Sequence, residues 1–458
     1  MSVKAIILAA GQGTRMKSDL PKVLHEVAGR PLVSWALGAV HEAGIEDVVV
    51  VVGHGAERVT ELLPDTVTVA VQEEQLGTGH AARIGLEAMP VGEGDTVVVL
   101  PGDMPLLTAG SVAALLDARA GAAAALLTAQ VADPAGYGRV RRDASGAVAA
   151  IIEEADASDD EKTITEVSSG VFAFDGAVLG DLLAALEPDN AQDEYYLPDV
   201  IARLAGDGRP PAAVRMAAEE LTGVNSHEQL AAAGRLMRER INRHWMAAGV
   251  AMIDPDRVYI DAGVVLEPGA MLYPGTHLEG ATAIGAGARI GPDTFVRDSV
   301  IGSGSHVWYS VLRNARVAER VEVGPYASLR PGADLADGSK AGTFVEIKQS
   351  TVGPRSKVPH LAYLGDATLG EDVNIGAGTI TCNYDGFAKH RTIIGDRAFT
   401  GSDTMLVAPL EIGDDGWTGA GSVITQDVPS GALAVERSQQ KVVPGYAERR
   451  RKKAQEGK

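Results

Sequence analysis

The chain has 458 residues and a formal net charge of −20 at pH 7, with 45% apolar residues and only 4% aromatic ones. That charge, with no basic stretch on the scale of a domain, excludes nucleic acid and a membrane surface as partners. No run approaches the roughly 20 apolar residues of a membrane span, the apolar opening is too short for a signal peptide, and the one cysteine permits no internal disulfide, so we expect a cytoplasmic protein.

Residues 1–226 alternate β-branched runs with stretches of helical periodicity. Apolar residues follow one another without interruption in the runs at 4–10, 47–53, 66–72 and 95–103, and helical segments stand between them. Such continuous runs are typical of parallel strands covered on both faces. The pattern predicts an α/β domain that binds its ligands at the carboxyl ends of its strands.

The first strand leads into the stretch LAAGQGTRM. Met16 stands where the dinucleotide-binding fingerprint requires a third glycine, and the Walker A pattern is absent. Gly11 and Gly13 let backbone amides approach phosphate oxygens, while Arg15 and Lys22 supply positive charge for a polyphosphate. We interpret the stretch as a triphosphate-binding turn, and an ordinary strand–helix turn is the alternative.

Four segments of this half carry a resemblance to a known family. LAAGQGTRM, LPKVLH at 20–25, QEEQLGTGHA at 72–81 and LPGDMPL at 100–106 resemble the signature of the sugar-1-phosphate nucleotidyltransferases, in their uridylyltransferase branch. In that family a sugar phosphate oxygen attacks the α-phosphorus of a nucleoside triphosphate, and pyrophosphate leaves. The resemblance implies an α/β Rossmann-like nucleotidyltransferase domain over residues 1–226, with UTP as co-substrate and Mg²⁺ as cofactor.

The same resemblance implies roles for individual residues. It makes Arg15 and Lys22 catalytic, and it makes Asp103 and Asn225 ligands of Mg²⁺, a hard cation that prefers oxygen. The residues that it implies for UTP and the sugar nucleotide are Leu8, Ala9, Ala10, Gly11, Gly13, Lys22, Gln72, Gly77, Thr78, Gly138, Glu153, Ser168 and Asn225. Among them, the residues implied around the uracil are Gln72, Gly77 and Thr78, and those implied around the sugar are Gly138 and Glu153.

Structural alternatives stand beside three of these roles. Asp103 could be a plain loop carboxylate, Asn225 a turn residue, and Glu153 a solvated strand end beside Glu154. The sequence also departs from the family pattern at Ser168, which stands where the family usually has an asparagine. Because serine is shorter, we expect a weaker or water-mediated contact with the ligand at this position.

Residues 227–250 follow with one long helical pattern. Its apolar stripe consists of Leu230, Met237, Ile241 and Trp245. We interpret it as a connecting helix between two domains.

From 251 to 437 the sequence changes to a hexapeptide repeat. The aliphatic residues six positions apart are Ile260, Leu266, Leu272, Leu278, Ile284, Ile290 and Val296, then Val317, Val323, Leu329 and Leu335, then Val352, Val358 and Leu364, and finally Ile394, Leu406, Ile412 and Ile424. This period predicts a parallel β-helix in which each aliphatic side chain stacks on its counterpart one coil away. The series breaks around 340–350 and 381–393, where we expect loops or bent strands to leave the coil.

Polar residues that a simple coil does not require gather around His360. They are Arg330, Lys348, Tyr363, Asn374, Asn383, Tyr384 and Lys389. Imidazole suits proton abstraction at neutral pH, so His360 is a candidate general base for an acyl transfer to an amine. A structural or surface histidine, in a repeat that only assembles or regulates the protein, is the alternative.

Three blocks of this half carry a second resemblance. LRPGA at 329–333, GEDVNIGAGTITCNYDG at 370–386 and GSDTMLVAP at 401–409 resemble the bifunctional enzymes that acetylate glucosamine-1-phosphate and then uridylylate the product, and the likeness extends from residue 3 to about 440. It implies a left-handed β-helix, a homotrimer with shared acyl sites, His360 as general base and acetyl-CoA as co-substrate. The residues implied for the sugar phosphate are Arg330, Lys348, Tyr363, Asn374 and Lys389, and those implied for acetyl-CoA are Asn383, Tyr384, Ser402, Ala420 and Arg437.

Two features stay open at the carboxyl end. The basic run at 449–453, within a tail from 438 to 458, is either a solvated tail or a contact to the coenzyme phosphates, and we expect Cys382 to pack rather than react. The whole pattern predicts a bifunctional enzyme that makes UDP-N-acetylglucosamine for cell-wall synthesis. A monofunctional nucleotidyltransferase with an assembling β-helix and a non-enzymatic scaffold are the alternatives, although intact Arg15, Lys22 and Asp103 argue against the scaffold.

Overall fold

The computed structural model describes residues 2–456 and divides the chain into two compact units, Met1–Ile241 and Asn242–Lys458. The first unit is built on a nine-stranded sheet with the order β11-β7-β10-β6-β1-β4-β5 and a β8–β9 hairpin beside β10. Its strands are β1 (Val3–Ala9), β4 (Asp47–Val52), β5 (Thr68–Val71), β6 (Thr96–Pro101), β7 (Ala124–Gln130), β8 (Arg139–Arg142), β9 (Val148–Ile152), β10 (Glu166–Asp175) and β11 (Ala212–Arg215). A separate small ribbon pairs β2 (Glu26–Val27) with β3 (Arg30–Pro31).

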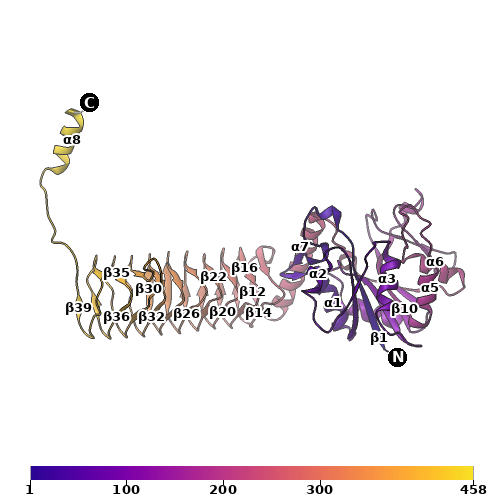
Figure 1. Cartoon of the computed structure of the whole chain (residues 1–458), viewed down its shortest axis with the longest axis horizontal. Coiled ribbons are helices and arrows are strands. Elements are labelled where there is room, and N and C mark those ends of the chain that lie inside the picture. The colour runs from indigo at the N-terminus through magenta and orange to yellow at the C-terminus, as the bar shows by residue number, and fades with distance from the viewer. Residues whose placement is uncertain (1, 457–458) are drawn as a thin grey trace. The chain divides into compact units, whose positions relative to one another are not determined.

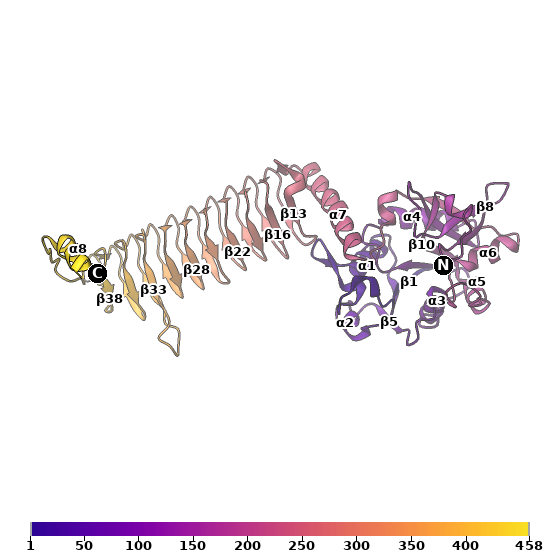
Figure 2. The same ribbon diagram turned by 90° about the horizontal axis from the view of Figure 1, so that it is seen from above.

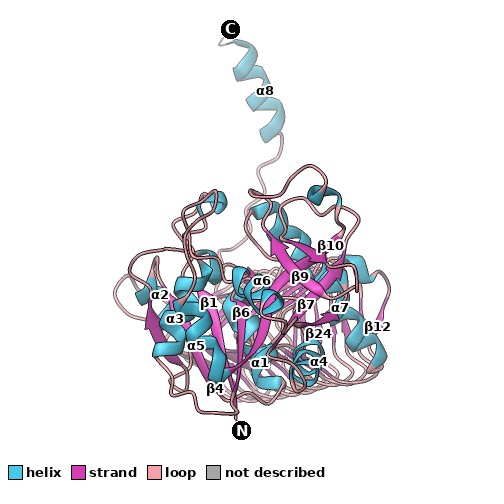
Figure 3. Cartoon of the chain, turned by 90° about the vertical axis from the view of Figure 1, so that its right-hand side faces the viewer, coloured by secondary structure: helices cyan, strands magenta, loops and turns pink. Residues whose placement is uncertain are grey.

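Helices cover both faces of this sheet (Figure 3). They are α1 (Leu32–Glu42), α2 (Ala56–Thr60), α3 (Thr78–Glu87), α4 (Ala109–Arg119), α5 (Gly176–Ala184) and α6 (Asp199–Gly206), with short 3-10 turns η1 (Thr14–Met16), η2 (Lys22–Leu24), η3 (Glu161–Thr163) and η4 (Ala218–Leu221). Along β1, Ala5 and Ile7 belong to the core under α1 and α4, whereas Ile6 belongs to the core under α3, α5 and α6. The continuous apolar runs of the sequence therefore arise because both faces of the strands are buried.

The four strands predicted from the sequence are confirmed as β1, β4, β5 and β6, and they are mutually parallel. The sheet as a whole is mixed, because β10 runs antiparallel to both β6 and β7. The segment between β7 and β10 holds the β8–β9 hairpin and the short turn η3 in place of a crossover helix. A parallel connection needs a crossover, so the chain returns antiparallel here.

The helix predicted to connect the two halves is α7 (His227–Ala247). Its residues Leu230, Met237 and Ile241 pack with Met16 and Leu32 in a third apolar cluster of the first unit. Trp245, the last member of the predicted stripe, contacts the neighbouring ring of His244 instead. In residues 2–456, no helix combines the length and apolarity that a membrane crossing requires.

The second unit is a left-handed parallel β-helix whose coils stack side by side from β12 to β39 (Figure 1). The first sheet holds β12 (Ala251–Met252), β15 (Met271–Leu272), β18 (Arg289–Ile290), β21 (His306–Val307), β24 (Glu322–Val323), β27 (Lys340–Thr343) and β30 (Lys357–His360). The second holds β13 (Val258–Ile260), β16 (Thr276–Glu279), β19 (Phe295–Arg297), β22 (Val311–Arg313), β25 (Ser328–Leu329), β28 (Glu346–Lys348), β31 (Tyr363–Gly365), β33 (Ile380–Cys382), β35 (Met405–Val407) and β38 (Val423–Ile424).

The third sheet closes the triangle and further short elements complete the unit. The sheet holds β14 (Val265–Leu266), β17 (Ala283–Ile284), β20 (Val300–Ile301), β23 (Arg316–Val317), β26 (Ala333–Leu335), β29 (Ser350–Val352), β32 (Ala367–Leu369), β34 (Thr392–Ile394) and β36 (Leu410–Ile412). The remaining elements are the turn η5 (Pro255–Arg257), the pair β37 (Trp417–Thr418) and β39 (Leu433–Ala434), and α8 (Tyr446–Glu456), which has no buried residue.

One of the two expected breaks in the repeat is wrong. No loop leaves the coil at 340–350, because β27, β28 and β29 follow one another and Ala341 and Ile347 are buried in the stack. The apparent break arose because alanine fills one inward position and the corner before Val352 is one residue shorter. The second break is confirmed: β33 ends at Cys382, β34 begins at Thr392, and the insertion between them projects from the coils (Figure 2).

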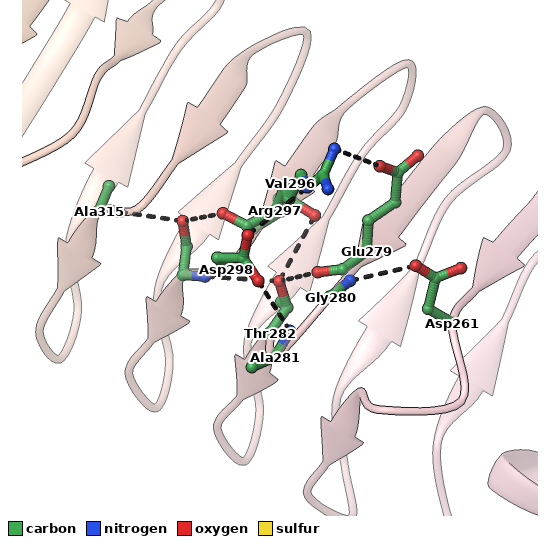
Figure 4. Close-up of polar contacts among 10 residues, drawn as sticks. Asp261, Glu279, Gly280, Ala281, Thr282, Val296, Arg297, Asp298 and Ala315 are labelled. Carbon is green, nitrogen blue, oxygen red and sulfur yellow. Dashed lines mark hydrogen bonds and ion pairs between the residues drawn. The ribbon is translucent and has the colours of Figure 1, made fainter. Parts of the chain in front are cut away.

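Buried hydroxyls at the corners hold neighbouring coils together (Figure 4). The Thr282 hydroxyl donates to the carbonyl of Glu279 in its own corner over 2.7 Å, and it accepts the amide of Ser299 on the next coil over 3.5 Å. One coil further on, the Ser299 hydroxyl donates to the carbonyl of Arg297 and accepts from the amide of Ala315. Such bonds satisfy backbone groups that a tight corner would otherwise leave buried without a partner.

Candidate active sites

The glycine turn after β1 makes room for a lysine. Gly13 has a left-handed φ of +63°, and a Cβ there would lie 2.6 Å from Cβ of Lys22. Any other residue would be strained by this φ and would collide with the base of the lysine side chain. Gly13 therefore acts on the site through Lys22, which begins η2.

Lys22 meets two oxygen ligands that come from distant parts of the chain. Its Nζ lies 2.5 Å from Oδ2 of Asp103 and 3.0 Å from Oδ1 of Asn225. Asp103 comes just after β6, and its carbonyl accepts the amide of Val224 over 3.0 Å, which brings Asn225 to the same place. The Asp103 carboxylate is nearly buried, so its charge is balanced locally by the ammonium.

The two oxygens fit a divalent cation of the Mg²⁺ type. They are hard donors, they converge on one point, and that point already holds a positive charge in this structure. Among the described residues 2–456, no group of three or more His, Cys, Asp or Glu could enclose a metal by itself. An ion held here would take its remaining ligands from phosphates and water, as Mg²⁺ usually does.

A cavity of about 360 Å³ opens at the carboxyl ends of the strands beside this cluster. The residues expected from the sequence that line it are Leu8, Ala9, Ala10, Gly11, Lys22, Gln72, Gly77, Thr78, Asp103 and Glu153. Lining residues that sequence reasoning missed include Gln75, Gly170, Phe172 and Glu194. The set joins loops that follow β1, β5 and β6, which is the position at which open α/β sheets bind ligands.

The far wall of the cavity is fixed by hydrogen bonds across two loops. The side-chain Nε2 of Gln72 lies 3.2 Å from the carbonyl oxygen of Gly77 and 3.1 Å from Nδ1 of His80. The Thr78 hydroxyl accepts the amide of Leu197 over 3.0 Å, which ties the start of α3 to the segment before α6. These bonds leave a rigid edge that can recognise a flat polar ring.

The neighbouring carboxylates Glu153 and Glu154 have different surroundings. Glu154 is held by Arg139 at 2.6 Å and by the amide of Gly136. Glu153 lines the cavity, and burial, followed by repulsion from Asp199 and Asp156, raises the pKa of its carboxyl. Glu153 is therefore not a solvated strand end.

Five expected residues do not line the cavity, and each has another place in the structure. Arg15 is exposed on η1. Gly138 accepts the amide of Ser168 on its carbonyl, and a Cβ on Gly138 would approach Oε1 of Glu153 to 3.2 Å. The Ser168 hydroxyl accepts the amide of Gly170 over 3.2 Å, so the short side chain is used inside the chain while Gly170 lines the cavity. The others are Gly13 and Asn225, already described.

The second candidate site lies on the second sheet of the β-helix. The register pairs Glu346 with Tyr363 and Lys348 with Gly365 on neighbouring strands β28 and β31. Arg330 follows β25 on the coil before and pairs with Glu346 at 2.7 Å. Outward residues of neighbouring coils therefore gather cationic side chains on one face.

The insertion between β33 and β34 adds another cation to this face. The Lys389 ammonium, helped by burial and by Arg330, lowers the pKa of Lys348, while Asp366 opposes the effect. Like charges this close favour an anion between them. The arrangement suits a phosphate.

His360 and the remaining expected residues occupy separate positions. His360 ends β30 beside the corner that leads to Tyr363, and it is exposed. Asn374 lies on the first sheet, bridged to Lys357, and not on the face that carries Lys348. Cys382 is half-buried, and burial raises the pKa of its thiol, which agrees with packing rather than reaction.

The residues expected at acetyl-CoA form two groups. Asn383 and Tyr384 begin the insertion, where Tyr384 donates its hydroxyl to the carbonyl of Gly386. On later coils, the Ser402 carbonyl accepts the amide of Gly421, and Arg437 donates to the carbonyl of Ala420 over 3.1 Å. No described hydrogen bond joins one group to the other within residues 2–456.

The first unit is an α/β sheet with a glycine turn, a lysine and a carboxylate at the carboxyl ends of its strands, and the second is a parallel β-helix with a cationic face. Together they define a nucleotidyltransferase joined to a hexapeptide-repeat domain. Residues 5–241 match the model of the MobA-like NTP transferase domain.

Relatives match both halves together. The chain is 50% identical to the bifunctional protein GlmU of Heliobacterium modesticaldum over 98% of this chain and 99% of the relative. It is 50% identical to that of Carboxydothermus hydrogenoformans over 96% and 98%, and 48% identical to that of Streptomyces coelicolor over 97% and 94%. The chain belongs to the family of bifunctional GlmU proteins.

Proposed function

We propose that this chain makes UDP-N-acetylglucosamine by two reactions at two separate sites. At the β-helix, the amine of glucosamine-1-phosphate attacks the thioester carbonyl of acetyl-CoA, and the thiol of CoA leaves. At the sheet, a phosphate oxygen of N-acetylglucosamine-1-phosphate attacks the α-phosphorus of UTP, and pyrophosphate leaves. The observation that carries the proposal is the presence of two separate charged clusters, Lys22 with Asp103 and Lys348 with Lys389, in different units of one chain.

In the acetyl transfer, His360 takes the proton that the amine loses as the carbon–nitrogen bond forms. Lys348 and Lys389, with Arg330, bind the sugar phosphate through charge-assisted contacts. Tyr363 and Asn374 would orient the sugar, and Asn383, Tyr384, Ser402, Ala420 and Arg437 would contact acetyl-CoA, with the basic tail from 438 to 458 as a further contact for its phosphates.

In the uridylyl transfer, Lys22 and Arg15 stabilise negative charge that builds up on the triphosphate. Mg²⁺ held by Asp103 and Asn225 would neutralise further phosphate charge. Gln72, with Gly77 and Thr78, would hold the uracil at the rigid edge of the cavity, and Gly138 and Glu153 would hold the sugar. Since the Ser168 hydroxyl already accepts an amide of the chain, we expect only a weak or water-mediated contact there.

We assign residues 1–226 to uridylyl transfer, 227–250 to the connecting helix and 251–437 to acetyl transfer. We further propose that the chain works as a homotrimer in the cytoplasm, where UTP and acetyl-CoA are available. In support, Tyr309, Tyr326, Phe344 and Leu361 form a ladder of exposed apolar side chains on successive coils, with ring centroids 5.7 and 5.4 Å apart. Sedimentation of the chain as a monomer would contradict the trimer.

Two assays on the unmodified chain test the function. With acetyl-CoA and glucosamine-1-phosphate, we expect free CoA thiol to accumulate; with UTP, N-acetylglucosamine-1-phosphate and Mg²⁺, we expect pyrophosphate. A β-helix that only assembles the protein predicts pyrophosphate without free CoA. A non-enzymatic scaffold predicts neither product.

The raised pKa of Glu153 gives this site a pH dependence. We expect a Glu153→Gln variant to raise KM for N-acetylglucosamine-1-phosphate by about 10- to 100-fold, because a charged acceptor for sugar hydroxyls is lost. In the unmodified chain this KM rises as pH falls through the raised pKa, earlier than for an ordinary glutamate, and the variant loses that dependence.

The stability of the same variant tests the direction of the pKa shift at Glu153. A carboxyl whose pKa is raised on folding binds its proton more tightly in the folded state, so its contribution to the free energy of unfolding is lost as pH rises from the ordinary value through the raised one. Between these two pH values, denaturant titrations should show a smaller loss in the free energy of unfolding for Glu153→Gln than for the unmodified chain. The Glu154→Gln variant, which alters the carboxylate held by Arg139, is the matched control.

A further inference from the structure

Asp366 is an acidic residue at the corner between β31 and β32 that none of the proposed roles includes. Its backbone is left-handed, with φ of +52°, and its amide donates to the carbonyl of Lys348 over 3.1 Å. Its carbonyl accepts the amide of Thr392 over 3.2 Å, and its Oδ2 accepts the side-chain amide of Asn383 over 2.5 Å. One residue thus touches three segments of the second candidate site.

Two of these contacts fall at the two ends of the insertion 383–391. Asn383 begins it, and Thr392 resumes the coil as the first residue of β34. Asp366 therefore closes the base of the insertion against the coil below. A fixed base sets where the rest of the insertion projects.

The insertion is held in shape from within by a second aspartate. Asp385 accepts the amides of Phe387 and Ala388 over 2.8 and 2.7 Å, and it pairs with Nε2 of His390 at 2.8 Å. Because the loop has its own internal bonds, its residues keep their places relative to one another. The attachment at Asp366 then fixes where Lys389 lies relative to Lys348.

The surroundings of Gly365 show how closely the functional groups meet there. A Cβ at Gly365 would collide with the Tyr363 hydroxyl and with the side-chain nitrogen of Asn383. Asp366 engages that same nitrogen, so it turns the amide oxygen of Asn383 toward other partners. The Asp366 carboxylate also raises the pKa of Lys348 against the effect of Lys389, which eases the approach of the two ammonium groups.

We propose that Asp366 is a positioning residue of the acetyltransferase site, which fastens the insertion 383–391 to the coil so that Lys389 and Asn383 face the sugar phosphate and acetyl-CoA. This inference rests on the proposed acetyl transfer. Asp366 touches no reacting atom in it. It acts through Asn383 and through the place of Lys389.

The first test compares Asp366→Ala and Asp366→Asn in the full chain. For Asp366→Ala we expect kcat/KM for glucosamine-1-phosphate to fall by about 10- to 100-fold, because the insertion loses its fixed place. Asp366→Asn keeps an oxygen that can accept a hydrogen bond from Asn383, so its kcat/KM should fall less than that of Asp366→Ala. The loss that remains in Asp366→Asn measures the contribution of the negative charge. Pyrophosphate release should stay within about twofold of the unmodified chain, since that site belongs to the other unit.

The aspartate at the next corner along the chain provides the control. Asp372 has a similar left-handed φ of +56° and pairs with Arg355 on the outside of the coil, so Asp372→Asn should leave kcat/KM unchanged. Equal losses in Asp366→Ala and Asp372→Asn would overturn the proposal, as would an Asp366→Ala chain with kcat/KM within twofold of the original.

Hydrogen exchange tests the same fastening without any activity. Backbone amides of 383–391 should exchange at least tenfold faster in Asp366→Ala than in the unmodified chain, while those of β31 and β35 keep their rates. Unchanged exchange in the insertion would overturn the proposal even where activity falls. Faster exchange in a protein that releases no CoA would support the fastening and contradict the acetyl transfer, so the two failures are distinguishable.

Discussion

A His360→Ala variant is expected to lose acetyl transfer by about 10²- to 10⁴-fold in kcat and to keep uridylyl transfer. The loss follows because the amine must give up a proton as it attacks the thioester, and a positioned base contributes a factor of this size. His360 ends β30 on the corner beside Tyr363, and it is exposed, so its removal leaves no cavity in the stack. Parallel assays of free CoA and of pyrophosphate on one preparation measure both activities.

The matched control for this variant is a histidine of the same β-helix on a coil distant from the cationic cluster. His277, on β16, stacks on Tyr259 with ring centroids 4.4 Å apart, and His277→Asn should leave both activities intact. Two results would count against separate sites with His360 as the base: a loss of both activities together in His360→Ala, or a loss of neither. Unfolding midpoints of the two variants should agree with the unmodified chain, which separates a chemical loss from a structural one.

The β-helix was predictable because its period is built into the sequence. Every coil places an aliphatic side chain inward at nearly fixed spacing, and residues such as Leu272, Ile290 and Val307 are stacked in register as this spacing requires. The prediction failed around 340–350 because Ala341 also fills an inward position, which a search for larger aliphatic residues passes over. Small inward residues and corners shortened by one position hide a coil without breaking it.

The sequence carried an unused signal for Asp366. Contacts between neighbouring coils join residues about one coil apart, as Arg355 with Asp372 and Asp366 with Asn383 do, each 17 residues apart. Pairs of opposite or complementary side chains at that spacing could have been sought once the repeat was recognised. The corner hydroxyls of Thr282 and Ser299 follow the same spacing.

The residues of the first site could not be paired from a fixed spacing in the sequence. Lys22 is separated by 81 residues from Asp103 and by 203 from Asn225, and an α/β sheet has no fixed period that relates them. Both Asp103 and Asn225 were assigned by resemblance, although the position of Asp103 after a buried strand agrees with the rule that ligands bind at the carboxyl ends of strands. The internal bond of the Ser168 hydroxyl depends on a local irregularity of β10 between Ser168 and Phe172, which only the fold reveals.

A Lys22→Ala variant should have the largest effect on the first site. We expect uridylyl transfer to fall by about 10²- to 10³-fold, as when one charge-stabilising group is removed from a preorganised site, while acetyl transfer is unchanged. The same substitution leaves the nearly buried Asp103 carboxylate without its ammonium, so the free energy of unfolding should fall by about 1 to 3 kcal/mol. Lys17→Ala, which removes an exposed lysine of the same turn, is the control for both measurements.

Unfolding midpoints measured with added Mg²⁺ test, without an activity assay, whether Lys22 and the metal bind the same oxygens. In the unmodified chain the ammonium lies against Oδ2 of Asp103 and Oδ1 of Asn225, so a metal must compete with it for the same oxygens. In Lys22→Ala that competitor is gone, and Mg²⁺ should raise the unfolding midpoint more than it does in the unmodified chain. Asp103→Asn, made in the Lys22→Ala background, should abolish the difference. An equal rise in all three proteins would mean that these oxygens do not hold the ion, and the metal site would have to be sought elsewhere in the cavity.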